Sequence, residues 1–86
     1  MPTISQFYGI KIYIFYDDHN EPHIHAYYGG NEAGISIKSG KILSGDLPKN
    51  ASKLVKQWIE EHKEELINDW ELAKQHEKLN KIDPLE

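Results

Sequence analysis

The sequence predicts an α+β fold: an antiparallel β-meander of three to four strands, followed by a C-terminal helical hairpin or by one long, broken helix. The first half of the chain contains short runs in which apolar and polar residues alternate, separated by turn sequences, as in strands buried on one face. From residue 51 onward the apolar residues recur at helical spacing instead. We expect a single domain over residues 1–86, with the meander at about 9–45, the helices at about 48–78 and a tail at 79–86.

Four segments show the alternation of strands: Ile10–Tyr16, His23–Tyr28, Glu32–Lys38 and Lys41–Ser44. Their connections are short, and Gly29-Gly30 is typical of a hairpin turn, so consecutive strands should pair antiparallel. The first seven residues are interpreted as a lead-in whose Ile4 and Phe7 pack on the sheet.

The alternation also assigns side chains to the two faces of the sheet. The apolar set is expected to face the core: Ile10, Ile12, Ile14, Ile24, Ala26, Ala33, Ile35 and Ile37. The opposite face then carries His23 and His25 together with Lys11, Tyr13, Phe15, Tyr27 and Lys38. This second face is half aromatic and half polar, which is unlike an ordinary solvated face.

The helical region is too long for one straight helix inside a domain of this size. A helix over residues 49–78 would be about 45 Å long at a rise of about 1.5 Å per residue, whereas such a domain is about 30 Å across. Glu64 and Glu65 would suit the positive end of a new helix beginning near His62. We therefore expect a break there, or a helix that reaches out to a partner.

Composition narrows the classes of function. There is no cysteine, which excludes disulfides and thiolate zinc sites. The net charge is −4 and all ten basic residues are lysines. Because arginine is the usual reader of phosphate and guanine, nucleic-acid binding is not favoured. No run approaches the ~20 apolar residues of a membrane span, and the N-terminus lacks the pattern of a signal peptide, so we expect a cytoplasmic protein.

Titratable and aromatic side chains concentrate in Asp17–Tyr28, which holds three of the five histidines. The candidate catalytic residues are Asp18, His19, His23, His25 and Tyr28. Histidines at i and i+2 of a strand project to the same side, and a third from the preceding turn could complete a metal site. The candidate metal ligands are His19, His23 and His25, a set that suits zinc or nickel, although the pattern does not demand a metal.

Two other interpretations of this cluster remain open. A histidine beside a carboxylate can transfer protons near neutral pH without a metal, and with Lys11 as the positive group it could cleave RNA. Alternatively, the histidines and tyrosines form a sheet face that a second copy of the chain or another protein covers.

The ordered series of motifs resembles the DUF4160 family of small bacterial proteins over nearly the whole chain. The matching motifs are Pro2–Ile10, Asp18-His19-x-x-Pro22-His23-Ile24-His25, Tyr28-Gly29, Gly45-x-Leu47-Pro48, Trp58, His62-x-x-Glu65-Leu66, Trp70 and Ile82-x-Pro84-Leu85. The sequence departs from the family pattern at Ile24, where an aromatic residue is commoner.

The resemblance implies a small protein that is often encoded beside a second small protein, and some members are described as toxins of type II toxin–antitoxin pairs. It carries no catalytic assignment. We expect a toxin-like or regulatory component of a two-gene module that binds a protein partner or forms a homodimer. The alternatives are a metal-binding enzyme or sensor, or a metal-independent RNase.

Overall fold

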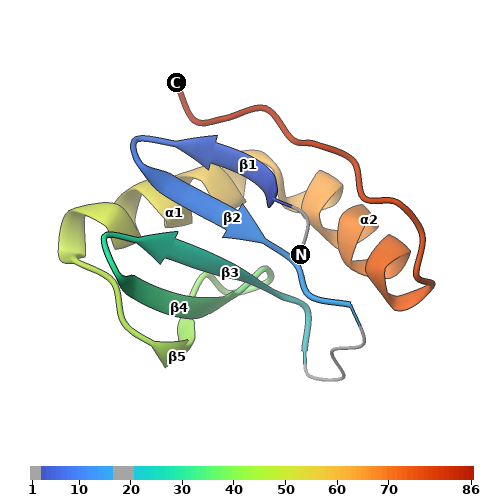
Figure 1. Cartoon of the computed structure of the whole chain (residues 1–86), viewed down its shortest axis with the longest axis horizontal. Helices are drawn as coiled ribbons and strands as arrows, with labels where there is room; N and C mark the ends of the chain where they lie inside the picture. Colours follow the sequence, from blue (N-terminus) through green and yellow to red (C-terminus); the bar gives the residue numbers. More distant parts are fainter. Residues whose placement is uncertain (1–2, 17–20) are drawn as a thin grey trace.

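The computed structural model describes residues 3–16 and 21–86, and in this part of the chain a five-stranded antiparallel sheet precedes two helices (Figure 1). The strands are β1 (Thr3–Phe7), β2 (Ile10–Tyr13), β3 (His23–Tyr28), β4 (Asn31–Ser36) and β5 (Ile42–Gly45), and the helices are α1 (Lys49–Glu61) and α2 (Lys63–Lys74). The strands lie side by side in chain order. The predicted α+β meander with two C-terminal helices is therefore confirmed.

The first seven residues, predicted as a lead-in, contain an additional strand, β1. Residues of β1 pair antiparallel with β2, with a register shift between Thr3 and Ser5. Because of this irregularity Ile4 and Ser5 are both buried, so the segment lacks the alternation by which a strand is recognised. The predicted packing of Ile4 and Phe7 into the core is confirmed.

The core lies between the sheet and the helices, and Figure 1 shows α1 behind the sheet and α2 beside the ends of β1 and β2. Every residue predicted for the core face is at most 1% exposed. From the helices, Val55, Trp58 and Leu66 complete this layer, and the indole of Trp58 packs on Phe7 with ring centroids 5.3 Å apart. The alternation of the strands thus predicted the correct face throughout.

The predicted helix break is at His62, between α1 and α2. Glu64 and Glu65 lie in the first turn of α2, where the helix dipole favours acidic side chains. The Oε1 atom of Glu65 is 2.7 Å from Nδ1 of His62. The molecule is 33 Å along its longest axis, so a straight helix over residues 49–78 would have protruded. Neither helix of the described chain has the length and apolar character needed to cross a membrane.

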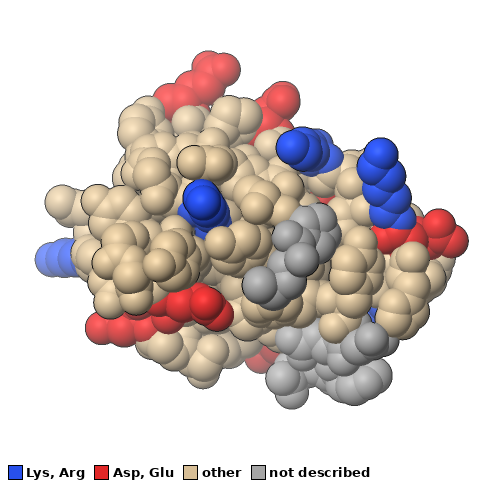
Figure 2. All heavy atoms as spheres, viewed as in Figure 1, with Lys and Arg blue, Asp and Glu red and all other residues tan. Residues whose placement is uncertain are grey.

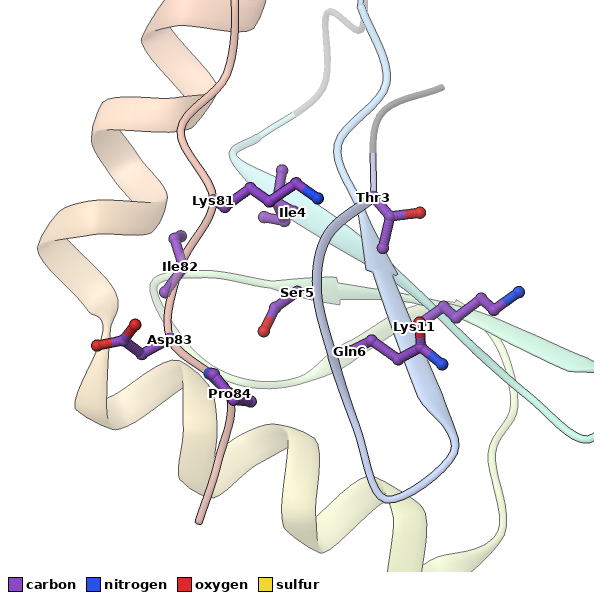
Figure 3. Close-up of a pocket in the computed structure, with 9 residues that line it drawn as sticks. All are labelled: Thr3, Ile4, Ser5, Gln6, Lys11, Lys81, Ile82, Asp83 and Pro84. Atoms are coloured by element: carbon purple, nitrogen blue, oxygen red, sulfur yellow. The ribbon is translucent and has the colours of Figure 1, made fainter.

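Residues 79–86, predicted as a tail, pack along β1 and the helices. Leu79, Ile82 and Leu85 are buried. The backbone N–H of Ile82 donates to the carbonyl of Ile4 (2.9 Å), and the indole N–H of Trp58 donates to the carbonyl of Asp83 (2.8 Å). Figure 3 shows the open pocket of about 450 Å³ between β1 and this segment. The segment therefore covers the outer edge of β1.

Candidate functional site

The predicted site residues divide into three groups. Asp18 and His19 lie outside the described residues. His23 and His25 lie on β3 and, as predicted, project to the face away from the core. Tyr28 ends β3 and packs against the core cluster beside Gly9. Tyr28 is five positions, about 17 Å, along the strand from His23, and it packs towards the core whereas both histidines project to the other face, so the structure does not bring Tyr28 to the histidines.

Aromatic rings form a continuous series, which we call the ring ladder: Tyr13, Phe15, His25 and His23 lie on this face of the sheet, and Trp70 joins them from α2. Centroid distances along the series are 6.5, 4.1, 4.9 and 5.2 Å. The two closest contacts, Phe15 with His25 and His25 with His23, are edge-to-face, the geometry that aromatic quadrupoles favour. Pairing of Tyr13 with His25 across β2 and β3 sets the register that builds the ladder.

Gly34 lies next to the imidazole rings of His23 and His25 on the same face of the sheet. It pairs with His25 across β3 and β4. A Cβ placed at Gly34 would lie 3.8 Å from Cδ2 of His23, 3.9 Å from Cε1 of His25 and 2.9 Å from Oγ of Ser44. Absence of a side chain at this position therefore leaves room for the serine hydroxyl beside the histidine rings.

His23 is held in one orientation. It is 6% exposed, and its Nδ1 is 2.7 Å from the backbone carbonyl of Glu21. A carbonyl can only accept, so Nδ1 carries the proton. The Glu21 carboxylate in turn accepts a hydrogen bond from the Ser36 hydroxyl (2.9 Å). A pocket of about 380 Å³, lined by Glu21, His23, Leu43 and Ser44, opens at this point.

His25 is placed beside a carboxylate. Its side chain is 16% exposed, and its Nδ1 lies 3.5 Å from Oε1 of Glu32, whose side chain is 52% exposed. Phe15 packs edge-to-face on the same ring, with ring centroids 4.1 Å apart. The arrangement supplies one imidazole–carboxylate pair near solvent, the minimum needed for proton transfer.

Within residues 3–16 and 21–86, no three histidine, aspartate or glutamate side chains are grouped as metal ligands. The predicted metal set includes His19, which lies outside those residues, so the set His19, His23 and His25 stays a prediction. The Nδ1 atoms of His23 and His25 both face oxygen atoms of the chain. Such contacts commonly orient imidazoles whose Nε2 binds a metal.

Sequence reasoning did not identify Gly34, Glu32 and Trp70 as parts of the site. Gly34 and Glu32 follow from the register that the Gly29-Gly30 turn sets, because counting back from the turn places Gly34 opposite His25. Trp70 comes from α2, and no local pattern in the sequence connects it with His23.

Comparison with known proteins gives one match. Residues 9–71 match the family model described as a domain of unknown function, DUF4160. No curated protein and no solved structure gives a match. The matched segment contains β2 to β5, α1 and most of α2, hence the whole ring ladder. The chain therefore belongs to the DUF4160 family.

Proposed function

We propose that this protein is the toxin-like, protein-binding component of a two-gene module, and that its partner docks on the sheet face that carries the ring ladder. The observation that carries the proposal is the position of Tyr13, Phe15 and His25, which form a series of ring contacts on the side of the sheet away from its buried isoleucines. Aromatic residues on an uncovered sheet face are typical of surfaces that another protein buries.

The chemistry of this face fits a protein rather than a nucleic acid. Tyr27 is 39% exposed, and Tyr13 and Phe15 are half-buried. Figure 2 shows that the described surface in front of the sheet is mostly uncharged, with few lysines. Rigid aromatic side chains supply much of the binding energy of protein interfaces, whereas a nucleic acid would need a basic surface.

The toxin-like role and the two-gene context rest on the family. The resemblance implies that a second small protein is often encoded beside such a chain. A small protein with partly exposed aromatic side chains on a sheet face gains from a dedicated partner, because that partner removes apolar surface from water.

A growth assay combined with a binding assay tests the proposal. Expression of the chain alone should inhibit growth, and co-expression of the small protein encoded beside it should restore growth and give a complex that co-purifies. Tyr27→Lys should weaken the complex by about tenfold or more. Tyr8→Lys is the control, because Tyr8 is 59% exposed but lies in the turn between β1 and β2. Normal growth at high expression, or equal binding by both variants, would refute the proposal.

A second candidate function is proton-transfer or metal chemistry at His23 and His25. It is favoured by the contact between the two rings and by the carboxylate beside His25. RNA cleavage that His25→Ala and Glu32→Gln both abolish would support it, and elemental analysis of untagged protein would separate metal-bound from metal-free chemistry. His62→Ala is the control, because His62 and Glu65 form a similar pair at the start of α2. Full activity of the His25 variant would end this candidate.

A further inference from the structure

The two edges of the sheet differ in how they are covered. The sheet order places β1 and β5 at its edges. The C-terminal segment lies along β1, with the N–H of Ile82 bonded to the carbonyl of Ile4. All four residues of β5 are exposed, and Ile42 and Leu43 are 36% and 45% exposed. In the described sheet β5 pairs with β4 alone.

The composition of β5 would allow a strand of another chain to pair with its outer edge. An exposed edge strand is a template for another strand, and proteins usually protect it with lysine, proline, a bulge or a covering segment. β5 is short and has the register shift opposite Gly34 and Ile35, two features that limit further pairing, but its four residues include no lysine or proline, and in the described sheet no strand pairs with its outer edge. Its four residues are uncharged, and the charges lie immediately outside it, at Lys41 and Asp46.

We propose that β5 pairs antiparallel with β5 of a second copy of the chain across a two-fold axis that passes between Leu43 and Ser44. The charges of Lys41 and Asp46, which flank β5, favour a second copy of the chain as the partner and favour this register. One end of the strand is positive and the other negative, and a two-fold axis brings each end to the opposite end of the partner strand. In this register each Lys41 lies opposite Asp46 of the second copy, so the edge is complementary to itself.

The pairing would join two five-stranded sheets into one and would cover Leu43. Because the two-fold axis is perpendicular to the sheet, the faces that carry the ring ladders lie on the same side. Leu43 and Ser44 also line the pocket at His23 and Glu21. The pockets of the two copies would therefore lie close to each other, beside the paired β5 strands. This inference does not rest on the proposed function, since it concerns the edge of the sheet rather than its face.

Strand pairing over four residues makes a short interface, below the roughly 1,200–2,000 Å² of a standard stable complex. We expect a dissociation constant on the order of micromolar. The test is sedimentation equilibrium over a wide range of protein concentration, where the mass should rise from that of one chain towards that of two. A mass of one chain at every concentration would overturn the proposal.

Charge exchange tests the register. Lys41→Glu and Asp46→Lys each turn two attractions into two repulsions, and each should raise the dissociation constant by about tenfold or more. An equimolar mixture of the two variants should restore association, because every facing pair in the mixed dimer is again of opposite sign. Lys53→Glu, on the exposed side of α1, should change nothing. Failure of the mixture to associate would overturn this register.

A folding control is required because the Asp46 carboxylate accepts the N–H of Leu47 (2.9 Å) just before α1. Circular dichroism of each variant checks that the helices are retained. Leu43→Lys offers an independent test, since this side chain is exposed in the single chain and covered in the pair. Loss of association in Leu43→Lys supports the pairing of β5 with β5 of a second copy, and unchanged association refutes this pairing.

Discussion

The imidazole of His23 packs against the indole of Trp70, with ring centroids 5.2 Å apart and planes inclined at 51°. Trp70 belongs to the core cluster, whereas His23 is the first residue of the strand that carries both candidate histidines. The contact therefore joins the candidate site to the packing of α2. A change that moves α2 should therefore alter the packing of the His23 ring.

Replacing Trp70 should affect both stability and the candidate site. Trp70→Ala removes a buried indole and should lower the free energy of unfolding by about 3–5 kcal/mol. In the milder variant Trp70→Leu, the ring-proton resonances of His23 should shift because the indole ring current is lost. His62 is the internal control, since its ring lies 5.5 Å from Trp58 instead. Unchanged His23 resonances would show that the contact does not form in solution.

Two glycines with similar backbones should respond very differently to substitution. Gly30 and Gly45 both have positive φ, 87° and 69°. A Cβ at Gly30 meets nothing within 4 Å, whereas one at Gly45 would collide with the backbone carbonyl of Glu32. Gly30→Ala should cost about 1 kcal/mol through backbone conformation, and Gly45→Ala should cost clearly more because β4 must move. Urea unfolding of both variants measures the difference, and equal losses would contradict the structure.

Asp69 should make stability depend on pH. Burial raises the pKa of this carboxyl above its ordinary value of 3.8; the N–H bond from Asn80 acts in the opposite direction, and the charge of Glu65 raises the pKa further. A raised folded-state pKa contributes stability that is fully present below the unfolded pKa and is lost as pH rises through the folded pKa.

Asp69→Asn should therefore become more stable relative to the parent as pH rises above about 4, because the amide never ionises. Its oxygen can still accept the Asn80 N–H that bonds Oδ1 at 3.0 Å. Thermal unfolding of both proteins over a pH series measures the effect. Asp83→Asn, at an exposed position, should show no such trend. A constant difference between Asp69→Asn and the parent at every pH would contradict the burial.

Removal of residues 82–86 should destabilise the domain. The deletion takes away two buried side chains, Ile82 and Leu85, and the backbone partners of Ile4 and Trp58. Burial of an aliphatic side chain contributes about 1.5–3 kcal/mol, so the loss should be several kcal/mol and should be visible in urea unfolding. Removal of Glu86 alone is the control. A full deletion that unfolds like the parent would show that the segment does not pack in solution.

Much of this architecture could be read from the chain because the signals are local. Alternation along Ile10–Tyr16 and His23–Tyr28 predicted which side chains face the core, and the acidic pair Glu64 and Glu65 predicted the break at His62. Both patterns depend on residues close in sequence, whose geometry is set by strand or helix period. The first strand was not recognised because the register shift at Thr3–Ser5 interrupts its alternation.

By itself, the sequence determined the fold class, the core face of the sheet and the common face of His23 and His25, because strand and helix periods depend on near neighbours. The tertiary structure decided which groups meet these histidines: Trp70 from α2, Glu32 across the hairpin and Gly34 beneath the rings. It also decided that the C-terminal segment lies along β1, whereas in the described sheet β5 is an exposed edge strand. These contacts join residues far apart in the chain, and their spacing follows from how the helices and strands pack rather than from any local pattern.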